Sequence, residues 1–184
     1  MSKTTEFKIT ETQIPGLFEI DISLIEDDRG YFQEKFQKAK LVAAGFPKDF
    51  SPVQQNISYN KQSGVTRGLH AEPWEKYVSI ITGKAFGAYV DLRKGKNFGK
   101  LVTIQLNATK AVFVPRGVAN SYQTLTSDVC YSYLVNEHWS QDAKYLSVNL
   151  ADADLDIDWP INLKDAIISD KDLKNPRLQD IKPF

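Results

Sequence analysis

Between residues 78 and 135, short runs of apolar and β-branched residues alternate with turns, and this pattern is the strongest constraint on the fold. Each run has the usual length of a strand, and Gly83 with Lys84 between the first two is typical of a tight turn. Closely spaced short strands are typical of sandwiches and barrels, so we expect an all-β fold of the jelly-roll type. The expected strands are residues 78–82, 85–92, 101–106, 111–114, 122–125 and 129–135.

The run at 129–135 shows what an interior could offer to a ligand. Side chains alternate between the two faces of a strand, so Tyr131, Tyr133 and Val135 share one face, while Cys130 and its alternate neighbours share the other. If the first face lines the barrel interior, it places a phenol in a pocket.

Helix is expected to be sparse. Residues 37–44 predict one short helix that is closed by Gly45 and then Pro47, and a second is expected to begin near Ser169. Within the strand expected at 85–92, Gly87 marks either a bulge or a close backbone approach.

Length and composition limit the class of protein. The 184 residues predict one domain, 1–184, and the 42% apolar and 25% charged fractions are those of a globular protein. Lys plus Arg equals Asp plus Glu at 23 each, which argues against a nucleic-acid or membrane-surface partner but leaves room for a small basic pocket. The single Cys130 excludes an internal disulfide and a multi-cysteine zinc site. The polar start at residues 1–6 lacks a signal-peptide core, so we expect a cytoplasmic protein.

One of only two histidines, His70, ends the segment Arg67-Gly68-Leu69-His70, and Lys76 follows six residues later. Histidine is the side chain whose ordinary pKa lies nearest neutral pH, so it suits a general base. A nearby lysine could stabilise an oxyanion that such a base creates. Taken alone, an isolated histidine is more often a hydrogen-bonded structural residue, and Lys76 is more often a solvated surface residue.

The chain contains, in this order, the segments 28–34 (DRGYFQE), 54–58 (QQNIS), 64–70 (GVTRGLH), 90–93 (VDLR), 97–99 (NFG), 114–120 (VPRGVAN), 156–160 (DIDWP) and 168–172 (ISDKD). In these segments it resembles the dTDP-4-dehydrorhamnose 3,5-epimerase family, cupin-type jelly-roll enzymes of nucleotide-sugar metabolism. The resemblance runs in order from Pro15 to Pro176, and the joint occurrence of its segments is more specific than any one of them. One position departs, because many members carry His where this chain has Asn120. Asn can hydrogen-bond a substrate oxygen but cannot act as an acid or base.

The resemblance implies acid–base catalysis on a 4-keto sugar, with no cofactor and no metal. It implies that His70 is the base, Asp172 orients it, Tyr133 is the opposing acid and Lys76 stabilises the enolate. Like His70 and Lys76, the other two residues have other readings from the residues alone. Ser169-x-x-Asp172 also matches a capping box at a helix start, and Tyr133 could be a core or rim tyrosine.

The same resemblance implies the residues that bind a dTDP-sugar. Two arginines would clamp the diphosphate, two amides and Asn120 would hydrogen-bond the sugar or base, and an aromatic residue would stack on the nucleotide. The 29–34 segment would reach the pocket of a partner subunit, which implies a homodimer; His138 is read as structural. The implied substrate-binding residues are Arg29, Phe32, Glu34, Gln54, Asn56, Arg67, Asn120 and Trp139.

Three alternatives remain open at this point. The first is a 3-epimerase acting on the same substrate, which would use the same residues. The second is a metal-dependent cupin, although only His70 and His138 are present as histidine ligands and Asn120 stands where another would be needed. The third is a non-catalytic nucleotide-sugar binding module, because a fold does not by itself fix a function.

Overall fold

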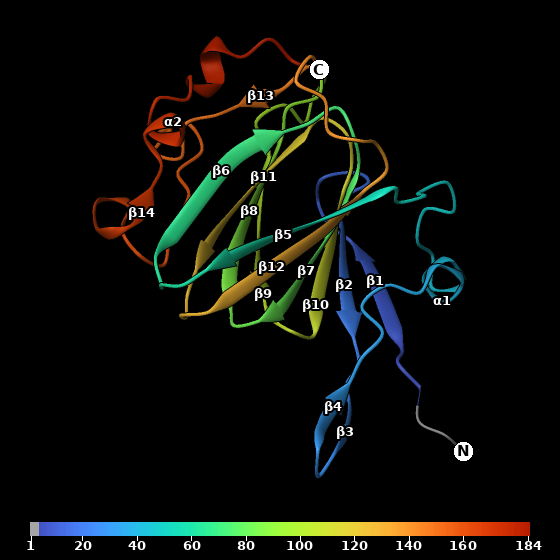
Figure 1. Cartoon of the computed structure of the whole chain (residues 1–184). Helices are drawn as coiled ribbons and strands as arrows, with labels where there is room; N and C mark the ends of the chain where they lie inside the picture. Colours follow the sequence, from blue (N-terminus) through green and yellow to red (C-terminus); the bar gives the residue numbers. More distant parts are fainter. Residues whose placement is uncertain (1–3) are drawn as a thin grey trace.

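The computed structural model describes residues 4–184 and consists mainly of two antiparallel β-sheets that face each other (Figure 1). The start of the chain at residues 1–3, part of the segment in which we expected no signal peptide, lies outside the described residues. Within residues 4–184, no helix combines the length and apolar character that crossing a bilayer requires.

The first sheet has the strand order β1-β2-β10-β7-β12-β5, and the second has the order β13-β6-β11-β8-β9. The short β14 pairs with β6 in parallel, and β3 and β4 form a separate hairpin that projects from the sandwich (Figure 1). The strands are β1 Phe7–Glu11, β2 Phe18–Ile22, β3 Ile25–Asp27, β4 Gly30–Phe32, β5 Gln54–Asn60, β6 Val65–Ala71, β7 Lys76–Thr82, β8 Ala85–Asp91, β9 Leu101–Leu106, β10 Lys110–Val114, β11 Val118–Thr124, β12 Val129–Val135, β13 Leu146–Ser147 and β14 Ile167–Ile168.

The sequence pattern located the central strands well. The bounds of β9 and β12 are those predicted, whereas β11 begins at Val118, four residues before the predicted start at Tyr122. Gly87 lies in an unbroken register with both neighbouring strands, so no bulge occurs there. A Cβ at Gly87 would instead stand 2.8 Å from Oη of Tyr89, so this glycine makes room for a buried ring rather than for backbone.

Both predicted helices are present. Helix α1 spans Lys38–Ala43, and its N-cap Gln37 accepts a hydrogen bond from the backbone N–H of Lys40 at 2.8 Å. Helix α2 spans Asp170–Leu173 with Ser169 as its N-cap. Two single 3₁₀ turns lie at Leu163–Asp165 and Leu178–Asp180.

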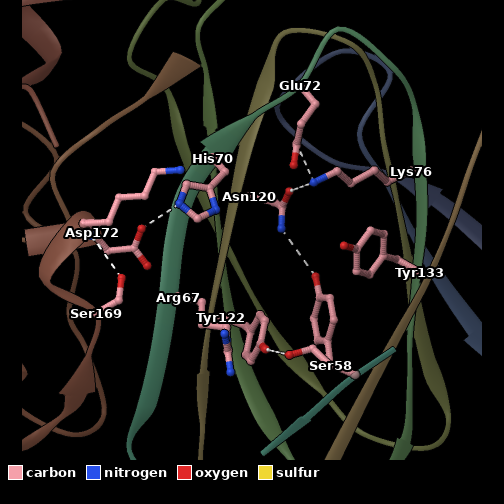
Figure 2. A pocket seen from close by; sticks show the side chains of 12 residues that line it. Ser58, Arg67, His70, Glu72, Lys76, Asn120, Tyr122, Tyr133, Ser169 and Asp172 are labelled. Carbon is pink, nitrogen blue, oxygen red and sulfur yellow. Dashed lines mark hydrogen bonds and ion pairs between the residues drawn. The ribbon is translucent and has the colours of Figure 1, made fainter. Parts of the chain in front are cut away.

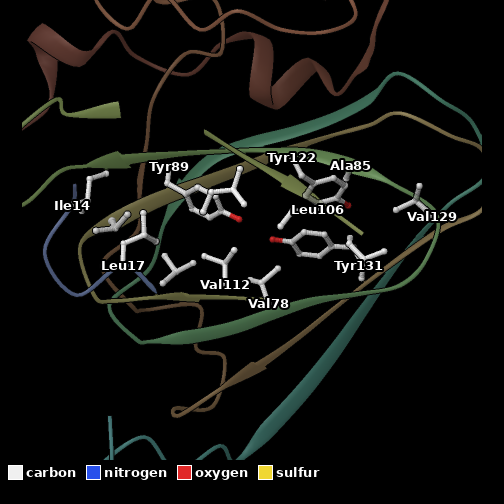
Figure 3. Close-up of a cluster of buried hydrophobic side chains, with 14 residues drawn as sticks. Ile14, Leu17, Val78, Ala85, Tyr89, Leu106, Val112, Tyr122, Val129 and Tyr131 are labelled. Atoms are coloured by element: carbon white, nitrogen blue, oxygen red, sulfur yellow. The ribbon is translucent and has the colours of Figure 1, made fainter. Parts of the chain in front are cut away.

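The core fills the space between the two sheets (Figure 3). Aliphatic side chains from β7 and β10 meet residues from β8 and β9, and burial of this apolar surface is the main driving force for folding. Towards one end the core becomes aromatic and polar. There Tyr122 and Tyr131 stack with ring centroids 4.1 Å apart, and they form the floor of a cavity. The inward face of β12 therefore carries Tyr131 and Tyr133, as the alternation predicted.

Candidate active site

A cavity of about 310 Å³ opens between the two sheets at this polar end (Figure 2). Its walls come from five strands and from α2, so residues far apart in the chain converge on it. All four residues predicted to be catalytic line this one cavity, together with the predicted binding residues Arg67 and Asn120. The lining residues are Ser58, Arg67, His70, Glu72, Lys76, Asn120, Tyr122, Tyr131, Tyr133, Ser169, Lys171 and Asp172.

His70 on β6 and Asp172 on α2 form a dyad. The imidazole Nε2 donates to Oδ1 of Asp172 at 2.7 Å, while the other ring nitrogen lies on the cavity side (Figure 2). Asp172 is buried, and its Oδ2 also accepts the backbone N–H of Gly68 at 3.4 Å. A buried carboxylate in this position orients the ring and stabilises its protonated form, as required of the partner of a general base.

The capping reading of Ser169-x-x-Asp172 is confirmed for the serine, whereas the carboxylate of Asp172 accepts from His70 and Gly68 instead of completing a capping box. The Oγ of Ser169 accepts the backbone N–H of Asp172 at 3.2 Å, which starts α2. Because the cap uses the backbone of Asp172, its carboxylate remains available to His70. Capping by Ser169 and pairing of Asp172 with His70 therefore coexist.

A bulge at Gly68 brings Arg67 and His70 to the same cavity. Residues three apart on a regular strand face opposite sides of the sheet. Here His70 is paired with Asn120 and Arg67 with Tyr122, so three steps on β6 match two on β11, and both side chains turn inward. Gly68 has φ +125°, and a Cβ there would stand 2.6 Å from the Cβ of Ser121. Only glycine allows β6 and β11 to approach this closely.

Lys76 is not a surface lysine, because its side chain is only 7% exposed. Its Nζ donates to Oδ1 of Asn120 at 2.8 Å and forms an ion pair with the carboxylate of Glu72. Asn120 in turn donates from Nδ2 to Oη of Tyr131 at 3.4 Å, so its amide is held at both ends. The site thus presents a fixed ammonium group on its wall.

Tyr133 on β12 faces the cavity from the sheet opposite His70 (Figure 2). Burial raises the pKa of its phenol above the ordinary value, and the nearby Glu72 carboxylate raises it further, while Arg67 acts in the opposite direction. The Nζ of Lys76 lies 5.4 Å from the ring centroid. Tyr133 is therefore a neutral hydroxyl at physiological pH, able to donate a proton.

The predicted nucleotide-binding residues Gln54, Asn56 and Trp139 line a second hollow of about 230 Å³. This hollow shares Glu72 and Tyr133 with the first cavity, so the two adjoin. Gln54 joins the other two residues, because its Nε2 donates to Asn56 at 2.9 Å and its Oε1 accepts the backbone N–H of Trp139 at 3.1 Å. The indole of Trp139 is 63% exposed and free to stack on a base.

The predicted residues of the 29–34 segment do not reach the cavity of their own chain. Arg29 lies on the β3–β4 hairpin with its guanidinium paired to Asp27, and Phe32 at the end of this hairpin is exposed. Glu34 forms an ion pair with Lys40. Their predicted role in a partner subunit's pocket stays a prediction.

Sequence reasoning missed several residues of the cavity. Glu72 and Lys171 carry charge into it, and Ser58 and Tyr122 share a hydrogen bond of 2.8 Å on its floor. Lys171 could have been found, because it directly precedes Asp172 at the start of a short helix. No pattern in the sequence around Glu72 indicated that this residue belongs to the site. Among residues 4–184, no group of three or more His, Cys, Asp or Glu side chains is placed to hold a metal ion.

Comparison with known proteins agrees with this geometry. The family model for dTDP-4-dehydrorhamnose 3,5-epimerase matches residues 11–180. A protein named RmlC homolog from Streptococcus pyogenes serotype M6 is 49% identical over 94% of this chain and 89% of its own length. The dTDP-4-dehydrorhamnose 3,5-epimerase of Methanothermobacter thermautotrophicus is 34% identical over 91% of this chain and 92% of its own length.

Solved structures show the same fold. RmlC from Streptococcus suis in complex with dTDP-D-xylose superposes with a TM-score of 0.92 at 46% identity, covering 99% of this chain and 95% of that one. RmlC from Legionella pneumophila in complex with dTDP-4-keto-L-rhamnose gives a TM-score of 0.86 at 30% identity, covering 96% and 95%. These matches confirm the cupin-like, all-β jelly-roll fold predicted from the sequence. This chain belongs to the dTDP-4-dehydrorhamnose 3,5-epimerase family.

Proposed function

We propose that this chain is an isomerase that epimerises dTDP-4-dehydro-6-deoxy-D-glucose at C3 and C5, giving dTDP-4-dehydro-L-rhamnose for dTDP-L-rhamnose biosynthesis. The observation that carries the proposal is the placement of a base and an acid on opposite walls of one cavity. His70 with Asp172 belongs to the β6 sheet, and Tyr133 belongs to the facing β12 sheet. Inverting a ring carbon requires a proton to leave one face and return to the other, and this arrangement provides for both.

The chemistry follows from the 4-keto group of the substrate, which acidifies the hydrogens on C3 and C5. His70 takes the proton from one of these carbons, and the electron pair moves to the keto oxygen, giving an enolate. Lys76 stabilises that oxygen by its positive charge. Tyr133 then donates a proton to the opposite face of the carbon and becomes a phenolate, while Asp172 stabilises the imidazolium of His70. Proton exchange with solvent restores both groups, and the second carbon follows the same course.

The remaining residues suit the nucleotide. Arg67 and Lys171 are cations on the wall of the ring cavity and would bind the diphosphate, and Asn120 would hydrogen-bond the sugar. The adjoining hollow with Gln54, Asn56 and Trp139 would hold the nucleoside, with the indole stacked on thymine. This division assigns each cavity to one half of the substrate.

We also propose that the enzyme is a homodimer in which Arg29, Phe32 and Glu34 contribute to the partner's pocket. What supports this is the β3–β4 hairpin, which projects away from its own sandwich and carries exposed aromatic residues (Figure 1). A hairpin of two three-residue strands is not stable by itself, so an exposed one gains from a second surface.

Proton NMR of the purified protein with dTDP-4-dehydro-6-deoxy-D-glucose in deuterated water tests the reaction. Deuterium entering at both C3 and C5, with product that a reductase converts to dTDP-L-rhamnose, is the expected result. Exchange at C3 alone would favour a 3-epimerase, the activity named for a relative from Streptomyces that is 28% identical to this chain. No exchange, with dTDP still bound, would favour a binding module and overturn the proposal.

A further inference from the structure

Glu72 stands on the wall between the two cavities and has no role in the acid–base steps derived above. It is the second residue after His70 and lies just beyond the end of β6. Its side chain is 16% exposed and lines both the ring cavity and the nucleoside hollow. A carboxylate in a site that binds an anionic nucleotide opposes binding by its charge, so its presence needs a physical reason.

The reason lies in the contacts of Lys76. An ammonium group has three N–H donors and no acceptor. One donor is used by the carboxylate of Glu72 and one by Oδ1 of Asn120 at 2.8 Å (Figure 2). Asn120 cannot turn freely, because its Nδ2 donates to the buried Tyr131. Two acceptors therefore hold Lys76, of which Asn120 is itself held by Tyr131, and the third donor of Lys76 remains for the cavity.

We propose that Glu72 is a positioning residue that acts through Lys76, aiming the third N–H of Lys76 at the oxygen that becomes the enolate. The inference rests on the proposed function, because it assigns a role at the same site. The flexible side chain of lysine loses much rotamer freedom when it is fixed, and a donor fixed in advance need not reorganise during the reaction. Glu72 also balances the charge of a buried ammonium, which would be costly without a partner.

Glu72 has a second effect at the same site. The titratable groups that face the phenol of Tyr133 are Glu72, Tyr122, Arg67, Lys76 and Tyr131. Among them, the Glu72 carboxylate is the nearby charge that most raises the pKa of Tyr133, after the effect of burial. Removing that charge therefore lowers the pKa of Tyr133, so that the phenol loses its proton at a lower pH. A role in folding alone would not produce this shift.

The test replaces Glu72 by an isosteric neutral group. We expect Glu72→Gln to lower kcat by about 10- to 100-fold, a part of the effect typical of losing one oxyanion donor, with KM changed by less than about threefold. The high-pH limb of kcat should move to lower pH. In a Lys76→Met background the same substitution should have almost no further effect on kcat, because the residue through which Glu72 acts is gone.

Glu75→Gln is the matched control. It removes the same charge from the same segment, but Glu75 accepts a hydrogen bond from Asn136 at 2.9 Å and lines neither cavity. We expect wild-type kinetics from this variant. Glu72→Asp keeps the charge and is expected to retain more activity than Glu72→Gln, which keeps the test open if the glutamine variant folds poorly.

Three results would overturn the inference while leaving the reaction established. The first is an unchanged kcat in Glu72→Gln. The second is that Glu72→Gln lowers kcat as much in the Lys76→Met background as in the wild type. The third is that Glu72→Asp and Glu72→Gln lower kcat equally. If the unchanged kcat of the first result came with a raised KM, Glu72 would act on nucleotide binding instead. Failure of the wild-type protein to exchange deuterium would instead refute the proposed function itself.

Discussion

Replacing Asp172 by Asn tests the dyad with little change in shape. Asn keeps the side-chain volume, and its backbone N–H still donates to Oγ of Ser169, so α2 should remain capped. What is lost is the negative charge beside His70, whose Nε2 lies 2.7 Å from Oδ1 of Asp172. The substitution therefore acts on the stability of the imidazolium that forms when His70 takes a proton.

The size of the effect follows from the geometry. Charge centres about 4 Å apart attract by about 4 kcal/mol at an effective dielectric constant of about 20. The side chain of His70 is 38% exposed, so solvent screens part of this attraction and about 3 kcal/mol remains. Since about 1.4 kcal/mol corresponds to a tenfold change, we expect kcat to fall about 100-fold in Asp172→Asn.

The assay is the rate of deuterium incorporation at C3 and C5, compared with reductase-coupled turnover. Asp170→Asn is the matched control, because Asp170 lies in the first turn of the same helix but is exposed to solvent. It should behave like the wild type. A fall of less than about fivefold in Asp172→Asn, with an unchanged melting temperature, would refute the argument that the carboxylate stabilises the protonated base.

Four further predictions concern the acid and its pH dependence, the subunit exchange and the bulge. Tyr133→Phe should slow epimerisation by at least about 100-fold, whereas His70 should still exchange deuterium into unepimerised substrate, as NMR would show. If the rates of epimerisation and of deuterium exchange fell equally, the assignment of Tyr133 as the acid would be contradicted. In the wild type, burial raises the pKa of Tyr133, so the phenol stays protonated to higher pH than an ordinary tyrosine, and the high-pH limb of kcat should lie correspondingly high. If Arg29 serves the partner's pocket, the Arg29→Ala and His70→Ala proteins should each be inactive alone. Mixing them should restore activity, because each mixed dimer would have one intact site. No recovery of activity on mixing would count against the homodimer proposal. Gly68→Ala should lower the free energy of unfolding by about 3 kcal/mol or more, because its Cβ would stand 2.6 Å from Ser121, and a melting temperature near that of the wild type would disprove the close approach.

The parts of the fold that follow from local pattern could be predicted. Strands β9 and β12 have the predicted bounds because alternation along a strand is a property of neighbouring residues. Helix α1 ends where Gly45 follows, since glycine readily adopts the φ of +103° found there. The strands before residue 71 escaped prediction from pattern, and they include β5 and β6, which supply walls of the cavity.

The sequence predicted which residues form most of the candidate site, but not how they are arranged in space. The motifs named His70, Tyr133, Asp172 and Lys76, and these four side chains do line one cavity. Nothing in the sequence around Glu72 marks it as the partner of a buried lysine, because that pairing depends on the chain's turn between β6 and β7.

Local pattern in the sequence predicts the strands between residues 78 and 135 and the end of helix α1, and the motifs name His70, Tyr133, Asp172 and Lys76, since each of these depends on residues close together in the chain or on a recognisable motif. How these residues meet depends on the tertiary structure. The partners His70 and Asp172 are 102 positions apart, and the bulge that turns His70 inward exists only where β6 pairs with β11. Burial of Lys76 likewise requires the sheets to close over it. Such contacts arise from long-range strand pairing and packing, which no local pattern encodes.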